Sequence, residues 1–452
     1  MQRNSRPGEP GATTDSSTAP APDDALVARI ASRIAAAGGW LPFDDFMAEA
    51  LYAPGLGYYS GGRRIFGLGP EGGSDFVTAP ELSPFFGRAL AVQVREALAA
   101  SGTGRVYEFG AGTGALAEQI LEALDADDAD DDGMLRVPVD YTIVELSGHL
   151  RERQQARLAR FAPRVRWLDA WPDTIEGVVV GNEVLDAMPV KLLHRSGGRW
   201  HERGVVDLQD PASAARATDP ANDGRHPVGA ADASGDARHP VGAADASADA
   251  RHPVGAADAS ADARHRFAFA DLEAPFSLEG ETQAAAALMD GFFVDGSVTE
   301  IHTIAESFVT SLADRLQRGV AILVDYGFPE HEYYHPQRLG GTLMCHQAHK
   351  ADGDPLADIG AKDITAHVNF SGIALAAQEA GLTVLGYTSQ ARFLINCGLV
   401  DLLAAASVGE RANAQKLVNE HEMGELFKVI ALARGCELDP IGFRAGDRSH
   451  ML

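Results

Sequence analysis

The chain has 452 residues, 45% of them hydrophobic, and a formal net charge of −26 at pH 7. This length allows one large domain or two ordinary ones, and the negative charge argues against a nucleic-acid-binding face and a polybasic membrane anchor. No run approaches the roughly 20 apolar residues of a membrane span, and the N-terminus lacks the apolar segment of a secretory signal. Cys345, Cys397 and Cys436 form no C-x-x-C pair, which predicts reduced thiols and a cytoplasmic protein.

The N-terminal part divides into a tail and a helical region. Residues 1–24 are rich in Pro, Gly, Ser, Thr and Ala, a composition typical of a disordered tail. Residues 25–104 predict helices, one of them over 41–51, with a long glycine-rich loop over 55–75 between them.

The segment that follows this loop offers two ways to start a helix. Thr78 and Glu81 fit a capping box, and Ser83–Pro84 fits an N-cap with proline in the first turn. This segment, which includes Pro80, is either a lead-in to a structural helix or a cover that lies across a cofactor.

Residues 105–117 predict a strand, a turn with three glycines and the start of a helix. Such a turn brings free backbone N–H groups close to a ligand. It fits two cofactor classes, a dinucleotide or S-adenosylmethionine (SAM), and the remaining alternative is a tight turn without a ligand. Glu108 favours SAM, because a carboxylate attracts the methionine ammonium and repels a pyrophosphate. The glycines are Gly110, Gly112 and Gly114.

The next two predicted strands each end on an acidic residue. Glu145 closes the strand over 139–145 and is expected to bind the ribose hydroxyls of the cofactor; the alternative is an ordinary strand-end or capping glutamate. Asp169 closes the strand over 165–169 and is expected near the adenine amine. The acidic run over 125–133 predicts a solvated loop.

A fourth strand over 177–183 is strongly apolar and runs into a polar cluster that contains Asn182, Glu183 and Asp186. Open α/β sheets place ligands just beyond the carboxyl ends of their strands. Glu183 and Asp186 share one face if the turn is helical. They are therefore either catalytic carboxylates or acidic residues that favour the start of a helix.

The chain then changes character. Residues 190–206 predict a β-hairpin around Ser196-Gly-Gly198. A 13-residue unit, rich in Ala, Asp and Gly, recurs from Arg225, Arg238 and Arg251. It lacks the apolar residues of a core, so residues 209–265 predict a disordered insertion in a hairpin.

The remaining chain predicts helices over 282–318 and 390–420 and strands over 320–327, 382–387 and 427–433. It also contains a group of potential metal ligands without the spacing of zinc enzymes. We therefore expect these side chains to lie at the surface or to face the substrate, and not to bind a metal. The group is His346, His349, Asp354, Asp363 and His367.

Taken together, the element order predicts an α/β fold with a Rossmann-like seven-stranded sheet whose last strand is antiparallel. The sheet is expected to occupy residues 105–208 and 266–435. An N-terminal helical region and inserted helices accompany it, and 436–452 is expected to form a C-terminal tail.

Several stretches of the sequence resemble the MidA family of class I SAM-dependent methyltransferases, which includes the mitochondrial protein-arginine methyltransferase of complex I assembly. The resemblance covers about 26–207 and 266–435. Asn369 stands where the family usually has Asp. The matching stretches are 51–59, 75–81, 108–114, 181–189, 325–327, 363–370 and 423–429.

This resemblance implies methyl transfer from SAM to a protein arginine, on a complex I subunit or a similar protein. A guanidinium nucleophile needs carboxylates to orient it, and Glu183 and Asp186 are the candidates for this catalytic role. A small-molecule methyltransferase, an NAD-dependent oxidoreductase and a non-catalytic assembly factor remain alternatives, and the oligomeric state is open. The expected cofactor residues are Thr78, Pro80, Glu108, Gly110, Gly112, Gly114, Glu145, Asp169 and Asn182.

Overall fold

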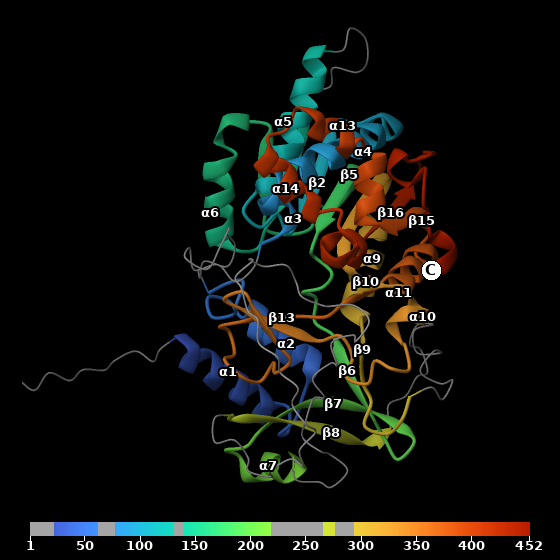
Figure 1. The fold of residues 1–452 in the computed structure, drawn as a ribbon. Helices are drawn as coiled ribbons and strands as arrows, with labels where there is room; N and C mark the ends of the chain where they lie inside the picture. Colours follow the sequence, from blue (N-terminus) through green and yellow to red (C-terminus); the bar gives the residue numbers. More distant parts are fainter. Residues whose placement is uncertain (1–21, 62–76, 131–138, 218–264, 276–292) are drawn as a thin grey trace, which may run out of the picture.

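The computed structural model describes residues 22–61, 77–130, 139–217, 265–275 and 293–452, and consists of two lobes (Figure 1). One lobe contains the large sheet with its covering helices. The other contains the first two helices and a smaller antiparallel sheet. No helix in the described ranges is both long and apolar enough to cross a bilayer.

The large sheet has the strand order β15-β16-β10-β5-β2-β3-β4. β16 is antiparallel to both of its neighbours, and the other pairs along this path are parallel. The predicted seven-stranded sheet with an antiparallel last strand is therefore confirmed. A short eighth strand, β14, pairs with the end of β10. The bounds are β2 Arg105–Phe109, β3 Asp140–Val144, β4 Val165–Leu168, β5 Ile175–Asn182, β10 Leu316–Phe328, β14 Val368–Asn369, β15 Thr383–Ser389 and β16 Phe427–Arg434.

Helices cover both faces of this sheet, which explains why β5 reads as a continuous apolar run. Val178 and Val180 pack on the side of α4 and α5, whereas Val179 packs on the side of α9 and α11. The other helices of this lobe are short. The bounds are α3 Ala79–Leu82, α4 Pro84–Ser101, α5 Ala115–Asp130, α6 Gly148–Arg157, α9 Thr303–Arg315, α10 Glu330–Tyr333, α11 Phe370–Glu379, α12 Gln390–Asn396, α13 Leu399–Leu402 and α14 Val408–Lys416.

The second lobe packs two helices against antiparallel strands. Leu26, Ile30 and Ile34 recur every four residues and form the buried face of the first helix, in one cluster with Phe46 and Phe267. The strand order is β1-β7-β6-β9, with β8 on β7, and a separate sheet has the order β12-β11-β13. The bounds are α1 Pro22–Ala36, α2 Phe43–Tyr52, β1 Leu41–Pro42, β6 Lys191–Ser196, β7 Arg199–Asp207, β8 Phe267–Pro275, β9 Val298–Ile301, β11 Met344–Gln347, β12 Lys350–Asp352 and β13 Asp363–Thr365.

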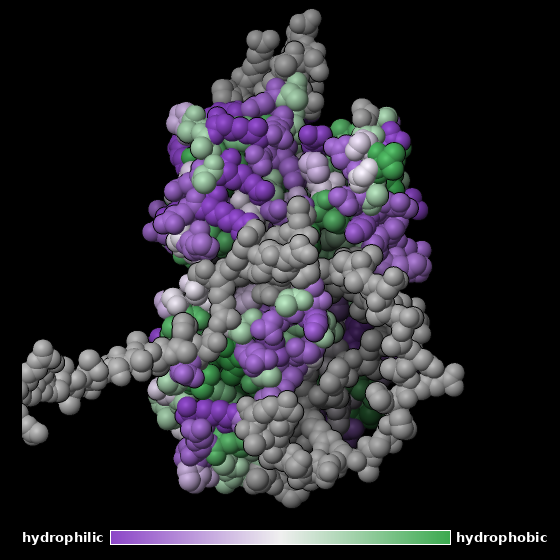
Figure 2. Space-filling model, turned by 60° about the vertical axis from the view of Figure 1, so that its left-hand side comes forward, coloured by the Kyte–Doolittle hydropathy of each residue, from purple (hydrophilic) through white to green (hydrophobic). Residues whose placement is uncertain are grey.

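The hydropathy of the surface agrees with a fold that buries its apolar side chains. On the face drawn in Figure 2, hydrophilic residues cover most of the large-sheet lobe, and hydrophobic residues show in smaller groups.

Two predicted helices begin differently from the expectation. Leu41 and Pro42 form β1, paired with β7, and α2 starts only at Phe43, because the extended backbone of Pro42 lies outside the helical region. Within 282–318, residues 298–301 form β9 on β6, where all four side chains are buried. The residues 276–292 lie outside the described part.

Three further expectations need correction. Helix α5 continues through the acidic run to Asp130, since neither Gly nor Pro interrupts it there. Residues 211–217 form helix α7 inside the range predicted as disordered, and Ser213 in that helix hydrogen-bonds to the carbonyl oxygen of Gly39. Helix α1 already starts at Pro22, inside the tail predicted for 1–24. The rest of that tail, 1–21, and the repeats at 225–263 lie outside the described residues.

The C-terminal residues expected as a tail pack against the large-sheet lobe. The amide of Gly442 donates to Gln93 Oε1 at 2.8 Å, and the amide of Tyr387 donates to Asp447 Oδ1 at 3.0 Å. Phe443 is buried against Phe393. These contacts make 436–452 part of the same core.

Candidate active site

A cavity of about 1530 Å³ lies where the two lobes meet, beyond the carboxyl ends of β2, β3 and β5. Single-ligand pockets have volumes of roughly 300–1,000 Å³, so the described cavity has room for two ligands. We call its two sides the glycine-turn half (77–82, 108–116, 144–150) and the carboxylate half (183–189, Tyr52, Tyr59, Asp363).

The three glycines after β2 adopt left-handed backbone conformations, with φ of 66° at Gly110, 52° at Gly112 and 81° at Gly114. A Cβ at Gly110 would lie 2.9 Å from a methyl carbon of Val184. The predicted glycine turn is therefore present, and α5 begins directly behind it at Ala115. Its backbone N–H groups are placed to hold a polar ligand group.

Two glutamates stand behind this turn. Glu108 is 2% exposed and accepts a hydrogen bond from Tyr141 Oη at 2.9 Å, and burial raises its pKa to about 8. Glu145 accepts from the amide of Ser147 at 2.8 Å and from Gln154 Nε2 at 2.9 Å, and burial raises its pKa. Both glutamates line the cavity.

Helix α3 packs directly on the glycine turn. Glu81 accepts hydrogen bonds from Thr113 and from Arg157, the latter at 2.9 Å, and Gln119 Nε2 donates to the carbonyl oxygen of Pro80 at 2.7 Å. Thr78 and Pro80 both line the cavity. Ser83 caps α4 by accepting from the amide of Phe85, whereas no side-chain cap bond is formed by Thr78.

One expected cofactor residue lies apart from the others. Asp169 is exposed and does not line the cavity, while its neighbours Ala170 and Trp171 do. Trp171 packs against Phe109 and Phe308, with ring centroids 4.5 Å and 4.9 Å away. The cavity wall next to β4 is therefore formed by aromatic rings, and Asp169 is not part of it.

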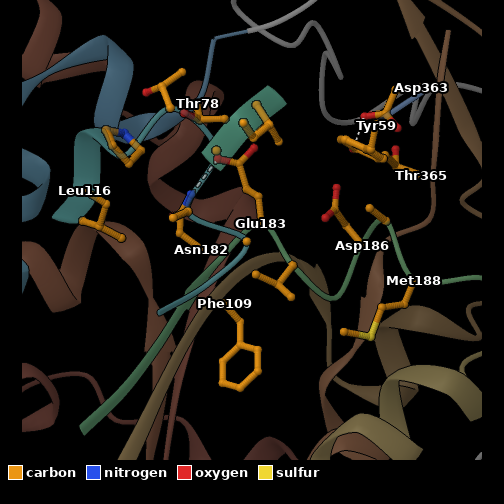
Figure 3. Close-up of a pocket in the computed structure, with 18 of the residues that line it drawn as sticks. Tyr59, Thr78, Phe109, Leu116, Asn182, Glu183, Asp186, Met188, Asp363 and Thr365 are labelled. Carbon is orange, nitrogen blue, oxygen red and sulfur yellow. Dashed lines mark hydrogen bonds between the residues drawn. The ribbon is translucent and has the colours of Figure 1, made fainter. Parts of the chain in front are cut away.

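The segment after β5 is a turn, and the expected helical face shared by Glu183 and Asp186 is not formed. Glu183 has a φ of 54°, an uncommon value for a residue other than glycine. Its Oε1 accepts from Asn182 Nδ2 at 2.9 Å. Burial raises the pKa of Glu183 to about 8 and that of Asp186 to about 6. Both side chains line the cavity, with Glu183 nearer to Thr78 (Figure 3).

Two residues at the end of β10 hold this turn. Asp325 Oδ2 accepts from the amides of Val184, Leu185 and Asp186 at 3.1, 2.9 and 3.3 Å. The next residue, Tyr326, donates a short hydrogen bond to Asp186 Oδ2. The sequence placed Asp325 at a strand end but gave no sign of this role, because the contact spans about 140 residues.

Residues from far along the chain complete the carboxylate half. Tyr59 Oη donates to Asp363 Oδ2 at 2.8 Å, although 304 positions separate the two residues. Tyr52 Oη donates to the carbonyl oxygen of Ala187 at 2.8 Å. The family-like stretches 51–59 and 363–370 contain these residues. Asp363 also belongs to the polar group that the sequence predicted at the surface or facing the substrate, whereas the two tyrosines had the resemblance as their signal.

Among the buried polar atoms of this lining without a hydrogen-bond partner in the described residues are two acceptors at the turn after β5, Asn182 Oδ1 and Asp186 Oδ1. Their residues are 9% and 5% exposed. A buried acceptor without a partner is costly unless a ligand supplies a donor. The lining therefore fits a ligand with hydrogen-bond donors at this position.

The possible metal ligands around residues 346–367 form other contacts. Asp363 bonds to Tyr59, and the ring of His367 packs edge-on against Tyr326 at 5.1 Å. Across the described ranges, no three His, Cys, Asp or Glu side chains converge as a metal-binding group.

The strand order with one reversed strand, together with a left-handed glycine turn that opens on a cavity, defines a class I methyltransferase fold. The turn, the carboxylate of Glu145 and the unpartnered Asn182 oxygen fit a cofactor with an amino-acid end and a ribose.

Comparisons with known proteins identify the family. Residues 87–388 match the sequence profile of the family Methyltransf_28, which is described as S-adenosyl-L-methionine-dependent methyltransferases. The chain therefore belongs to this family. A Burkholderia thailandensis protein crystallised with S-adenosyl-homocysteine shares 46% identity with a TM-score of 0.77, over 95% of this chain and 97% of its own. The cofactor is therefore SAM, and the protein is a SAM-dependent methyltransferase.

Two curated relatives are more distant. The mitochondrial protein arginine methyltransferase NDUFAF7 homolog of Drosophila melanogaster is 25% identical over 88% of this chain and 82% of its own length. The homolog of Caenorhabditis elegans is 30% identical over 184 residues, 35% of this chain and 41% of its own. These matches and the family model confirm the resemblance to the MidA family.

Proposed function

We propose that the protein methylates an arginine side chain of another protein. The observation that carries this proposal is the unpartnered oxygen of Asp186, buried beside the second carboxyl group, that of Glu183, in a cavity large enough for two ligands. A guanidinium group supplies several N–H donors and a positive charge, and it meets carboxylates in paired hydrogen bonds.

In this proposal the glycine-turn half holds the cofactor. Glu108 faces the methionine ammonium, the N–H groups around Gly112 face the methionine end, and Glu145 takes the ribose hydroxyls. Thr78 and Pro80 cover the cofactor from α3. Bound SAM supplies an activated methyl group, so the chain's own task is mainly alignment.

The carboxylate half orients the acceptor. Glu183 and Asp186 bind the guanidinium edge and direct one nitrogen toward the glycine-turn half. Transfer of a methyl group to that nitrogen would form an N–C bond, break the bond between the methyl carbon and the sulfonium sulfur of SAM to leave S-adenosylhomocysteine, and release one N–H proton. The carboxylate of Glu183, whose pKa is raised to about 8, accepts this proton and passes it to solvent.

The relatives support the choice of acceptor. Two of them are named protein arginine methyltransferases, at 25% and 30% identity. The sequence resemblance further implies a respiratory complex I subunit as the particular acceptor, and we propose a protein of that kind.

The test is methyl transfer from labelled SAM to a panel of arginine-containing peptides, each with a lysine-for-arginine counterpart. We expect label on arginine peptides alone. Transfer to a small molecule, or S-adenosylhomocysteine binding without any transfer, would favour a small-molecule enzyme or a non-catalytic assembly factor instead.

A further inference from the structure

We propose that the stacked pair Tyr52 and Tyr59 is the specificity-determining wall of the acceptor site, and that it selects a flat guanidinium over a compact ammonium group. The proposal rests on arginine methylation as proposed above and adds the residues that set the choice of side chain.

The two rings form one rigid unit at the end of α2. Their centroids lie 5.5 Å apart at an interplanar angle of 16°, which is an offset-stacked arrangement. Both residues line the cavity. Tyr52 is 41% exposed, a large value for an aromatic residue and one that leaves ring surface open to a ligand.

Protein groups engage both hydroxyls, so the rings are held in place. Tyr52 Oη donates to the carbonyl oxygen of Ala187, and Tyr59 Oη donates to Asp363, each at 2.8 Å. Asp363 is itself 3% exposed and accepts from the amide of Ile364 at 2.9 Å. The hydroxyls have these partners within the protein, and the open ring surface is what remains for an acceptor.

The wall stands beside the acceptor carboxylate. Ala187, which anchors Tyr52, directly follows Asp186 in the turn after β5. Figure 3 shows Tyr59 and Asp363 across from Asp186, on the side of the cavity away from Thr78. A side chain bound at Asp186 would therefore lie in the same part of the cavity as Tyr52 and Tyr59.

The chemistry of the two candidate acceptors differs at such a wall. A guanidinium is planar and weakly hydrated, so its face stacks on an aromatic ring while its edge donates to carboxylates. An ammonium is compact and strongly hydrated, and it cannot make both contacts in this way. Two carboxylates alone attract either cation, and the rings add the discrimination.

The experiment compares two variants at one position. Tyr52→Leu removes the ring, and Tyr52→Phe keeps the ring but removes the bond to Ala187. The probes are acetyl-Gly-Gly-Arg-Gly-Gly-amide and its lysine counterpart, assayed for methyl transfer and for binding to the enzyme saturated with S-adenosylhomocysteine. We expect the ratio of kcat/KM for the arginine peptide to that for the lysine peptide to fall about tenfold in Tyr52→Leu, mostly through a higher KM for the arginine peptide. A tenfold change matches the free energy of a cation–π contact. Tyr52→Phe keeps the preference.

The outcomes separate the two proposals. If the wild type methylates the arginine peptide and Tyr52→Leu keeps the arginine-over-lysine preference, the wall proposal is wrong and the proposed function stands. The same conclusion follows if Tyr52→Phe loses as much of this preference as Tyr52→Leu does. Loss of S-adenosylhomocysteine binding in Tyr52→Leu assigns the ring to the cofactor and also overturns the wall. A wild type that methylates no arginine overturns both. Tyr59→Leu, tested in parallel, is expected to repeat the effect of Tyr52→Leu.

Discussion

The two halves of the cavity are built in different ways. The residues of the glycine-turn half that follow β2 and β3 lie between 108 and 150, within one stretch of the chain. The carboxylate half joins Tyr59 to Asp363 across 304 positions and Asp186 to Tyr326 across 140. One compact stretch thus forms the part that we propose holds the cofactor, whereas long-range packing assembles the part that we propose meets the acceptor.

This difference predicts that damage to one half leaves the other intact. The variants below test that separation, and each needs two readouts, the affinity for S-adenosylhomocysteine and the rate of methyl transfer.

The largest effect is expected from Gly112→Val. A β-branched side chain is strained at the φ of 52° found there, and it would enter the cofactor side of the cavity. We expect calorimetry to show no measurable binding of S-adenosylhomocysteine. Gly409→Ala is the matched control, since a Cβ there meets nothing within 4 Å, and it should bind as the wild type does.

Glu183→Gln is expected to lower the rate of methyl transfer and to leave S-adenosylhomocysteine binding intact, in contrast to Gly112→Val. It removes the charge and the proton acceptor but keeps the shape, so kcat should fall about a hundredfold, measured as label transferred to an arginine peptide. S-adenosylhomocysteine affinity should change by less than about twofold. A parallel loss of affinity would show that Glu183 belongs to the cofactor half instead.

The pH dependence follows from the same residue. Burial raises the pKa of Glu183 to about 8, so the group is protonated and neutral below that pH and cannot pair with a guanidinium. We expect kcat/KM to rise about tenfold per pH unit between pH 6 and 7 and to level off above pH 8. A flat profile in the wild type would contradict this role.

The raised pKa also has a consequence for stability. Because the folded state holds the proton more tightly than the unfolded state, the free energy of unfolding falls as the pH rises from 4.5, the ordinary value, through about 8. Glu183→Gln should flatten this part of the curve in urea titrations.

The smallest effect is expected from Tyr326→Phe, which removes the hydrogen bond to Asp186 Oδ2. That bond lowers the pKa of Asp186 against the effect of burial, so its loss should move the acid limb of the pH–rate profile to higher pH. We expect kcat to fall about tenfold, the size of one hydrogen bond to a charged group. An unchanged profile would indicate a purely structural tyrosine.

Much of the fold was predictable because its signals are local. The apolar run before Asn182 and the alternating glycines mark a strand and a turn within a few residues, and the order of such units determines the sheet. The bounds of β3 and β5 differ from the predicted ranges 139–145 and 177–183 by two residues at most at either end.

The failures have physical reasons as well. Residues 298–301 form a strand because β6 offers a partner, and Leu41–Pro42 because β7 does; neither partner is visible in the local pattern. The carboxylate of Asp325 caps a turn that lies 139 to 141 positions away. The left-handed Glu183 directly precedes the three amides that Asp325 binds.

The most direct measurement is a crystal structure with S-adenosylhomocysteine and an arginine peptide bound together. We predict the amino-acid end of S-adenosylhomocysteine at the turn of Gly110 to Gly114, its ribose at Glu145, and the guanidinium between Glu183 and Asp186. A peptide arginine bound elsewhere, or S-adenosylhomocysteine seated among residues 183–189, would contradict the separation of the two halves.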